Sequence, residues 1–478
     1  MAAVAEQQTL NSKNPYLQGM YAPVAQEATC LELSVTGEIP ADIHGSYVRN
    51  GPNPQRAPEA MHHWFDGDGM MHAVYLENGR AEYRNRYVRS QDFIDDAAGT
   101  CRVGGVMEPA TLERSPKVYK DTANTDVILH NGQLMGLWYI SGNPVRVDPR
   151  TLETLGEESF SGKLPRHISA HSKTDPRSGE FLFFDYALYE PTMSCGVVDA
   201  NNQLQSFQTI DLPGPRLPHD MAFTENYFVL HDLPVVFTEQ ALRHHQWSIE
   251  VADQPTRFGV VPRSGVGGAK GKVQWFETEP CYIYHVINAW EEGDDIVMLG
   301  CKMVPNTHAD GSAFGPYKNM VEVLALNAVP CEWRMNLRTG KCRARVLDDA
   351  IGEFPAINLS AGGLRNRYAY VQSIAPENTL KFDGIYKYDF FTGDKTLYRY
   401  EKGVFGSEVA FAPRIGAVDE DDGYILCFCI DEASQTSELR IWNAKAIEDG
   451  PVARVHLPER VPAGFHATWA DASEWVGC

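Results

Sequence analysis

Four histidines in this chain stand at short polar interruptions of strand-like sequence and lie far apart from one another. They are His171, His219, His285 and His466. Imidazole is a good ligand for iron, copper, zinc and nickel, and four imidazoles without a thiolate form a neutral ligand set for a divalent transition metal. Taken alone, each histidine is more typical of an ordinary core or loop position, so a metal site depends on whether the fold brings the four together.

The sequence between these histidines predicts short β-strands joined by similar tight turns. Apolar or alternating runs, such as 181–186 and 424–430, are separated by turns that begin with Asp or Asn and close with Gly, such as 336–340 and 389–393. The Asx side chain bonds nearby backbone and glycine accepts a positive φ, which is hairpin chemistry. Recurring hairpins with little helical periodicity favour an all-β propeller over a sandwich.

A propeller would explain how distant residues meet. The innermost strand of each blade lines the central channel, so one residue from each of several blades can point at a shared axis. The alternative is that the four are unrelated members of the fifteen histidines in the chain. The architecture alone leaves both interpretations open.

The composition is that of an ordinary globular protein, with 43% hydrophobic and 22% charged residues in 478. A formal net charge of −21 argues against nucleic acid and anionic membrane surfaces as main partners, although an acidic balance is also a common solubility device. The ten cysteines form no CxxC pair, and the sequence shows neither a signal peptide nor an apolar run long enough to span a membrane. A reducing cytoplasm is the expected location.

Three ordered motifs connect the chain to a known family. They are Gly37–Pro40 (GEIP), Tyr47–Pro54 (YVRNGPNP) and the highly specific string His62–His72 (HHWFDGDGMMH). With them, the chain resembles the carotenoid cleavage oxygenases from about Asn14 to Trp469. The resemblance implies one domain over 1–478, a seven-bladed β-propeller with a dome of loops and short helices over the metal site.

The same resemblance implies the metal and the chemistry. The family's four Fe(II) ligands carry over onto His171, His219, His285 and His466, each in its expected local motif. Four neutral imidazoles would leave octahedral Fe(II) two open positions. The expected substrates are O2 and an electron-rich alkene that supplies the electrons, so no organic cofactor is expected.

Ligating histidines need an acceptor that fixes the second ring nitrogen. The family uses three glutamates, of which Glu353 and Glu408 carry over. Tyr139 stands where the third is expected, so a tyrosine, a water or a backbone carbonyl takes that role, or the alignment is shifted there. His167, four residues before His171, is a rival ligand.

The family's substrates are carotenoids or apocarotenoids, hydroxystilbenes such as resveratrol and lignostilbene, and phenylpropenes such as isoeugenol. Members that cleave phenolic alkenes hold the 4-hydroxyl group of the substrate with a tyrosine and a lysine. Here the tyrosine is missing from 101–106, and Trp138 occupies the region of the lysine. A carotenoid or apocarotenoid is therefore favoured, while Tyr119 or Lys120 could substitute and keep a phenolic alkene as the alternative. A monomer or weak oligomer with peripheral membrane contact is expected.

Other candidates have simpler interpretations. His62, His63 and His72 are expected to be structural rather than metal ligands, and the pair Glu291–Glu292 is expected at a solvated strand end rather than as an acid and base. A non-catalytic propeller and a propeller hydrolase with a carboxylate-rich metal site are the rival functions. Four histidines at the motif positions weigh against both.

Overall fold

Antiparallel β-sheets make up most of the chain. The computed structural model describes residues 11–58, 61–99, 105–107, 119–186, 188–238, 249–263 and 272–475. Within these ranges every paired strand runs antiparallel to its neighbour, from the first sheet to the last. The expectation of an all-β chain is confirmed.

The first half of the chain forms three four-stranded sheets and a two-stranded ribbon. Their strands are β6 (Asp126–His130), β7 (Gln133–Leu137), β8 (Val145–Val147) and β9 (Thr154–Glu157); β10 (Lys173–Thr174), β11 (Phe181–Tyr186), β12 (Thr192–Val198) and β13 (Leu204–Asp211); β14 (Ala222–Phe223), β15 (Tyr227–Asp232), β18 (Thr256–Pro262) and β19 (Gln274–Thr278); and the ribbon β16 (Val235–Phe237) with β17 (Ile249–Val251).

The second half forms one further four-stranded sheet and a larger sheet of linked strands. These are β20 (Ile283–Glu292), β21 (Asp295–Met303), β22 (Ala328–Asn336) and β23 (Lys341–Val346); then β24 (Gly352–Ala356), β25 (Tyr368–Ile374), β26 (Phe382–Asp389), β27 (Asp394–Arg399), β28 (Val404–Gly406), β29 (Ala410–Pro413), β30 (Gly423–Asp431), β31 (Thr436–Asn443) and β32 (Pro451–His456).

Strands from the two ends of the chain pair with each other. The end strand β33 (Ala467–Asp471) pairs with β3 (Gly45–Arg49), and β2 (Val35–Gly37) pairs with β32. The sheet that holds β33 is completed by β4 (Met70–Glu77), β5 (Arg80–Tyr87) and β1 (Thr29–Cys30).

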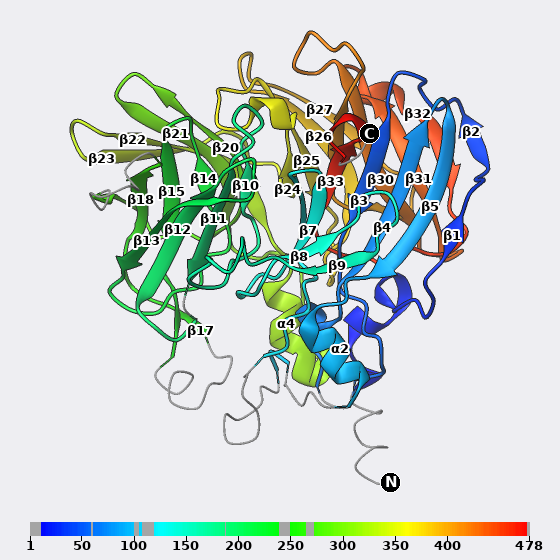
Figure 1. Ribbon diagram of the computed structural model, residues 1–478, viewed down its shortest axis with the longest axis horizontal. Coiled ribbons are helices and arrows are strands. Elements are labelled where there is room, and N and C mark those ends of the chain that lie inside the picture. Colours follow the sequence, from blue (N-terminus) through cyan, green and yellow to red (C-terminus); the bar gives the residue numbers. More distant parts are fainter. Residues whose placement is uncertain are drawn as a thin grey trace.

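Short helices gather at one end of the sheets. Figure 1 shows α2 (Gln91–Ala97) and α4 (Lys318–Val323) beyond the same end of the strands. The 3-10 turns are η1 (Pro15–Leu17), η2 (Gly19–Tyr21), η3 (Trp64–Asp66), η4 (Ser312–Tyr317), η5 (Leu359–Ala361), η6 (Ile447–Asp449) and η7 (Ala472–Glu474). Among the described residues, none of the helices has the length and apolar character needed to span a membrane.

The predicted turns join neighbouring strands. Asn78 and Gly79, between β4 and β5, have φ of 49° and 73°, as a two-residue hairpin turn requires. Between β22 and β23, the Gly340 amide donates to the Asn336 carbonyl at 2.9 Å, and Gly340 has a φ of 69°. The turn from Asp389 to Gly393 repeats this pattern between β26 and β27. Asx and Gly chemistry thus predicted these hairpins correctly.

The innermost strands touch from sheet to sheet. β6 lies against β33 and β10, β20 lies against β14 and β24, and β29 lies against β33. In Figure 1 the sheets stand around the middle of the molecule, with β10, β14, β20, β24 and β33 toward the centre. Residues at the ends of the inner strands are therefore brought together from distant parts of the sequence.

Apolar side chains between neighbouring sheets hold this arrangement together. Trp333 on β22 is fully buried and packs edge-on against Phe258 on β18, with the ring centroids 5.8 Å apart. We expect Trp333→Ala to lower the free energy of unfolding by about 3–5 kcal/mol, because it removes apolar contacts and leaves a cavity. Urea denaturation measures the loss. Val418→Ala, at a side chain that is 90% exposed, is the control and should change stability by less than about 0.5 kcal/mol.

Candidate metal centre

The four histidines all lie at the beginning of inner strands. His171 precedes β10 by two residues, and His219 precedes β14 by three. His466 directly precedes β33, and His285 is the third residue of β20. Because these strands run side by side and start at the same end, their first residues converge.

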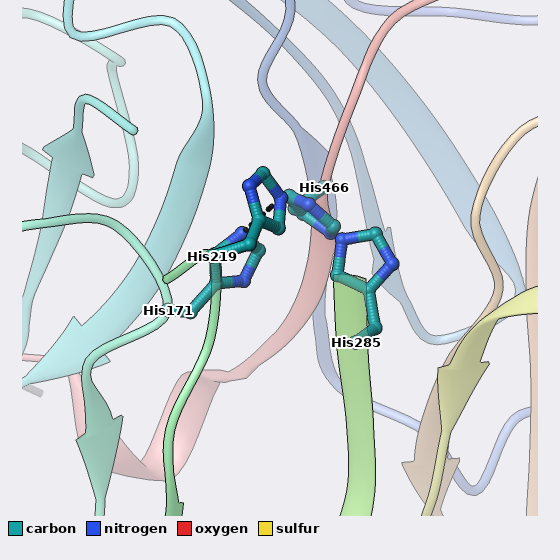
Figure 2. Close-up of side chains that lie close together, drawn as sticks. All are labelled: His171, His219, His285 and His466. Atoms are coloured by element: carbon teal, nitrogen blue, oxygen red, sulfur yellow. Dashed lines mark hydrogen bonds between the residues drawn. The ribbon is translucent and has the colours of Figure 1, made fainter. Parts of the chain in front are cut away.

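The imidazoles face one another closely (Figure 2). One ligand nitrogen from each of the four lies within 4.8 Å of those of the other three. His171 Nε2 and His219 Nε2 are 3.1 Å apart, and the His171 and His466 ring centroids are 4.5 Å apart. All four residues are at least nine-tenths buried. The rival His167 is exposed and lies outside this cluster.

Unusual backbone geometry aims two of the side chains. His171 has a φ of 62°, a left-handed conformation that residues other than glycine seldom adopt and that costs of order 1–3 kcal/mol. Its amide donates to Asp126 Oδ2 at 3.1 Å, which holds the strained turn. His285 lies where the register of β20 against β21 shifts between Ile283 and Val286, and such a bulge redirects a side chain.

Two glutamates contact the histidines from outside the cluster. His285 Nδ1 lies 2.6 Å from Glu353 Oε2, and His466 Nδ1 lies 3.1 Å from Glu408 Oε1. The same carboxylates accept the backbone amides of Phe354 and Ala467, which holds them in place. When Nδ1–H donates to a carboxylate, Nε2 carries the lone pair and can bind a metal.

The polar atoms of the cluster fit a divalent cation. His285 Nε2 is buried and has no hydrogen-bond partner, although a buried polar atom normally has one. Burial lowers the pKa of His171, His219 and His285 well below the ordinary value, so these rings are neutral and have a free lone pair. Neutral imidazole is the form that binds metals.

The pKa of His466 and that of Glu353 are raised, unlike those of the other three histidines. Burial alone would lower the pKa of His466, but the neighbouring Glu408 carboxylate raises it above the ordinary value. Burial raises the pKa of Glu353 to about 8. A divalent cation at the cluster would favour the ionised glutamates and neutral imidazoles, because its charge dominates the local field.

Tyr139 stands where the third orienting glutamate is expected. Tyr139 is buried in the wall of the cavity next to the cluster, and its amide donates to Thr125 Oγ1 at 3.0 Å. Asp126, which the sequence analysis did not single out, has Oδ2 4.0 Å from His171 Nδ1. Its position as the first residue of β6 gives no signal of this contact in the sequence.

An apolar cavity adjoins three of the histidines. It touches His219, His285 and His466. Among the described residues that line it, none carries a carboxylate, ammonium or guanidinium group. Its apolar wall includes Trp64, Phe65, Tyr284, Leu324, Phe354, Leu380 and Phe465. Such a site suits an apolar ligand held close to a metal.

The residues considered for binding a phenol are engaged elsewhere. Lys120 Nζ forms ion pairs with Asp68 at 2.6 Å and Asp96 at 2.8 Å, and Tyr119 Oη lies 2.6 Å from Tyr189 Oη. Neither Lys120 nor Tyr119 lines the apolar cavity. The phenol-binding tyrosine was expected within 101–106, and residues 101–104 of that segment lie outside the described part of the chain.

The remaining candidates have structural contacts. His63 Nδ1 accepts the Phe65 amide, and His72 Nδ1 lies 2.8 Å from Tyr83 Oη, so both serve local structure. Glu291 accepts hydrogen bonds from Thr224 and Asn226 near the end of β20. Within the described residues, the four-histidine cluster is the group able to hold a metal.

Buried neutral imidazoles that face one point, in an all-β chain, define a metal-binding protein. Comparison with known proteins then identifies its family. The chain matches the retinal pigment epithelial membrane protein family over residues 21–471. It therefore belongs to this family, that of the carotenoid cleavage oxygenases, as the sequence motifs predict.

Similar proteins include a carotenoid-cleavage dioxygenase, an isoeugenol monooxygenase and a lignostilbene dioxygenase. The carotenoid 9,10(9',10')-cleavage dioxygenase 1 of Pisum sativum is 33% identical over 95% of this chain and 89% of that protein. The isoeugenol monooxygenase of Pseudomonas nitroreducens is 29% identical over 96% and 98%. The crystal structure of Pseudomonas brassicacearum lignostilbene dioxygenase has a TM-score of 0.84, with 26% identity over 96% of this chain and 98% of that one.

Proposed function

We propose that this protein is a non-haem Fe(II) dioxygenase that cleaves a conjugated C=C bond with O2 to give two carbonyl products. Its proposed substrate is a carotenoid or apocarotenoid. The observation that carries the proposal is the contact between the four-histidine cluster and an apolar cavity whose described lining has no charged side chain other than histidine. The proposed iron ligands are His171, His219, His285 and His466.

The residues around the cluster would prepare the reaction. Fe(II) held by His171, His219, His285 and His466 would supply the redox chemistry that activates O2. Glu353 and Glu408 orient His285 and His466 through their Nδ1 hydrogen bonds. Phe354 packs against the His285 and His466 rings, with centroids 4.7 and 4.9 Å apart, and with Phe465 it gives the cavity an apolar wall that would exclude water. Because O2 provides both carbonyl oxygens and the alkene provides the electrons, no external reductant is required.

The architecture proposed for this site is a seven-bladed β-propeller with its dome formed by the short helices. Contacts between inner strands of neighbouring sheets support it, as does the pairing of β33 with β3, which joins the two ends of the chain. Figure 1 is consistent with sheets arranged around a central axis. The whole chain, 1–478, would then act as one domain.

Localisation and assembly are part of the same proposal. The described cysteines are free thiols, which supports a reducing cytoplasm. We propose a monomer or weak oligomer that contacts membranes only peripherally, since a polyene substrate partitions into lipid. Val323 on α4, next to the cavity residue Leu324, is 51% exposed and could take part in such contact.

A phenolic alkene is the second candidate substrate. Tyr139 and Tyr284 line the cavity and could meet a phenol hydroxyl, although no lysine is among the described lining residues. The similarity to an isoeugenol monooxygenase and a lignostilbene dioxygenase also supports it. The absence of a cation to hold a phenolate in the described lining favours the polyene.

A substrate panel tests the reaction and the choice of substrate. Iron-loaded protein is incubated with apocarotenals, resveratrol and isoeugenol, and product masses are measured with and without O2. We expect two carbonyl fragments from an apocarotenal, no product under anaerobic conditions, and no need for NAD(P)H, flavin or an oxo-acid. Much faster turnover of resveratrol or isoeugenol than of any apocarotenal would reverse the substrate assignment. Product formation without O2 would contradict the oxygenase assignment.

A further inference from the structure

A second cavity reaches the same histidines along the inner strands. We call it the polar channel; it is lined in part by His171, His285 and His466. His285 Nε2, buried and without a hydrogen-bond partner, belongs to a residue of this lining. The metal cluster thus borders two different spaces, the apolar cavity and the polar channel.

The polar channel follows the inner strands away from the cluster. Its lining continues from His171 to Pro176, from His285 to Ala289 and from His466 to Trp469. Four residues of strand span about 13 Å at ~3.3 Å per residue. Glu474 in η7, which is exposed, also lines the channel, so the channel reaches the surface at this end.

The charges in the polar channel are mainly negative. Its described lining holds four carboxyl groups, those of Asp126, Asp220, Glu408 and Glu474, and the single ammonium group of Lys173. Lys173 Nζ is paired with Asp220 Oδ1 at 2.7 Å. The apolar cavity has no such groups in its described lining.

This difference decides which space a metal ion can use. A hydrated divalent cation loses a large solvation energy in an apolar passage, whereas carboxylates replace its water and attract it. The four ligand histidines are buried, so an ion must cross one of the two spaces or wait for local unfolding. A channel that is lined with carboxyl groups and ends on histidine nitrogens can attract the cation, replace its water and deliver it to the ligands.

We propose that the polar channel is the path by which the metal ion enters and leaves the site, separate from the apolar cavity that receives the substrate. The inference rests on the proposed metal centre and adds a function for Asp220 and Glu474, to which the proposed reaction assigns no role. The channel's carboxylates attract and pass on the cation, and Glu474 marks its outer end.

Narrowing each space in turn tests the proposal. Ala356→Trp and Ile128→Trp place a large ring in the polar channel, and Leu380→Trp fills the apolar cavity as the matched control. Metal-free protein is mixed anaerobically with Fe(II), and bound iron is measured over time; release is measured with an excess of a water-soluble chelator. Thermal unfolding shows that each variant is folded.

The channel variants and the cavity variant should affect different measurements. We expect the channel variants to slow iron uptake and release by the same factor, leaving the dissociation constant unchanged. Leu380→Trp should take up iron at the wild-type rate and lose turnover. Slower uptake in Leu380→Trp, or wild-type rates in both channel variants, would overturn the proposed path. Failure of wild-type protein to bind iron at all would instead contradict the proposed function.

A charge change gives a second test that does not depend on tight packing. Glu474→Lys reverses a charge at an exposed position, so folding should be preserved. Because charged clefts typically raise association rates by about tenfold or more, uptake should slow about tenfold at low ionic strength and approach the wild-type rate in high salt. Glu250→Lys on β17, at an exposed position outside the channel lining, is the control. An equal effect of both substitutions would contradict the proposal.

Discussion

His285→Ala is expected to abolish both iron binding and alkene cleavage. The substitution removes one of four imidazoles, and it leaves Glu353, which lies 2.6 Å from His285 Nδ1, buried without that partner. Three remaining histidines offer a weaker and more open ligand set. Iron per chain after dialysis and turnover of an apocarotenal under air measure the two effects.

The matched control is His167→Ala. His167 lies four residues before His171 in the sequence, but it is exposed and lies outside the cluster, so iron content and turnover should stay at the wild-type level. Full iron content and turnover in His285→Ala would refute the assignment of this ligand. Loss of iron in His167→Ala, with the fold intact, would mean that the rival histidine binds the metal.

Glu353→Gln should weaken iron binding or turnover by about 10–100-fold, the usual cost of losing the group that orients a metal-binding histidine. Glutamine can still accept a hydrogen bond, but it has no charge to make the imidazole more basic. Glu353 is fully buried and also accepts the Phe354 amide, so no water can replace it without rearrangement. Chelator competition gives the iron affinity, and steady-state kinetics of iron-loaded protein give the rate.

Glu408→Gln is the matched comparison. Its contact with His466 is longer, 3.1 Å against 2.6 Å, so a smaller loss within the same range is expected. Glu291→Gln changes a carboxylate at a strand end and should affect neither iron affinity nor turnover. Wild-type iron affinity and kinetics in both Glu353→Gln and Glu408→Gln would show that these glutamates do not support the metal site.

Local chemistry in the sequence was enough to predict the strands and their turns. A hairpin turn of two residues requires a positive φ at both of them, which Asn and Gly tolerate. The structure has that turn at Asn78 and Gly79. The motifs between Gly37 and His72 were likewise sufficient to predict the family. The four histidines and the two glutamates were named from the motifs alone, because the residue types at those positions carry the resemblance.

The geometry around the histidines was decided by the tertiary structure. The strained φ of His171 and the nearby carboxylate of Asp126 depend on how β10 lies against β6, which no pattern within either segment reveals. Lys120, a candidate for binding phenols, is instead held by Asp68 and Asp96. The ion pairs were not predicted, because long side chains choose partners across the fold.

The two spaces beside the cluster were also invisible in the sequence. The apolar cavity draws its walls from distant segments, among them Phe65, Leu324 and Phe465. The polar channel collects carboxylates from β6, from η7 and from two segments between strands. Sequence periodicity determines which residues form a strand and which side chains share a face. The packing of whole sheets against one another determines which faces meet, because burial of apolar area is a sum over all of them. The sequence was therefore enough to identify residues able to bind a metal, whereas the surroundings of the cluster became visible only in the folded protein.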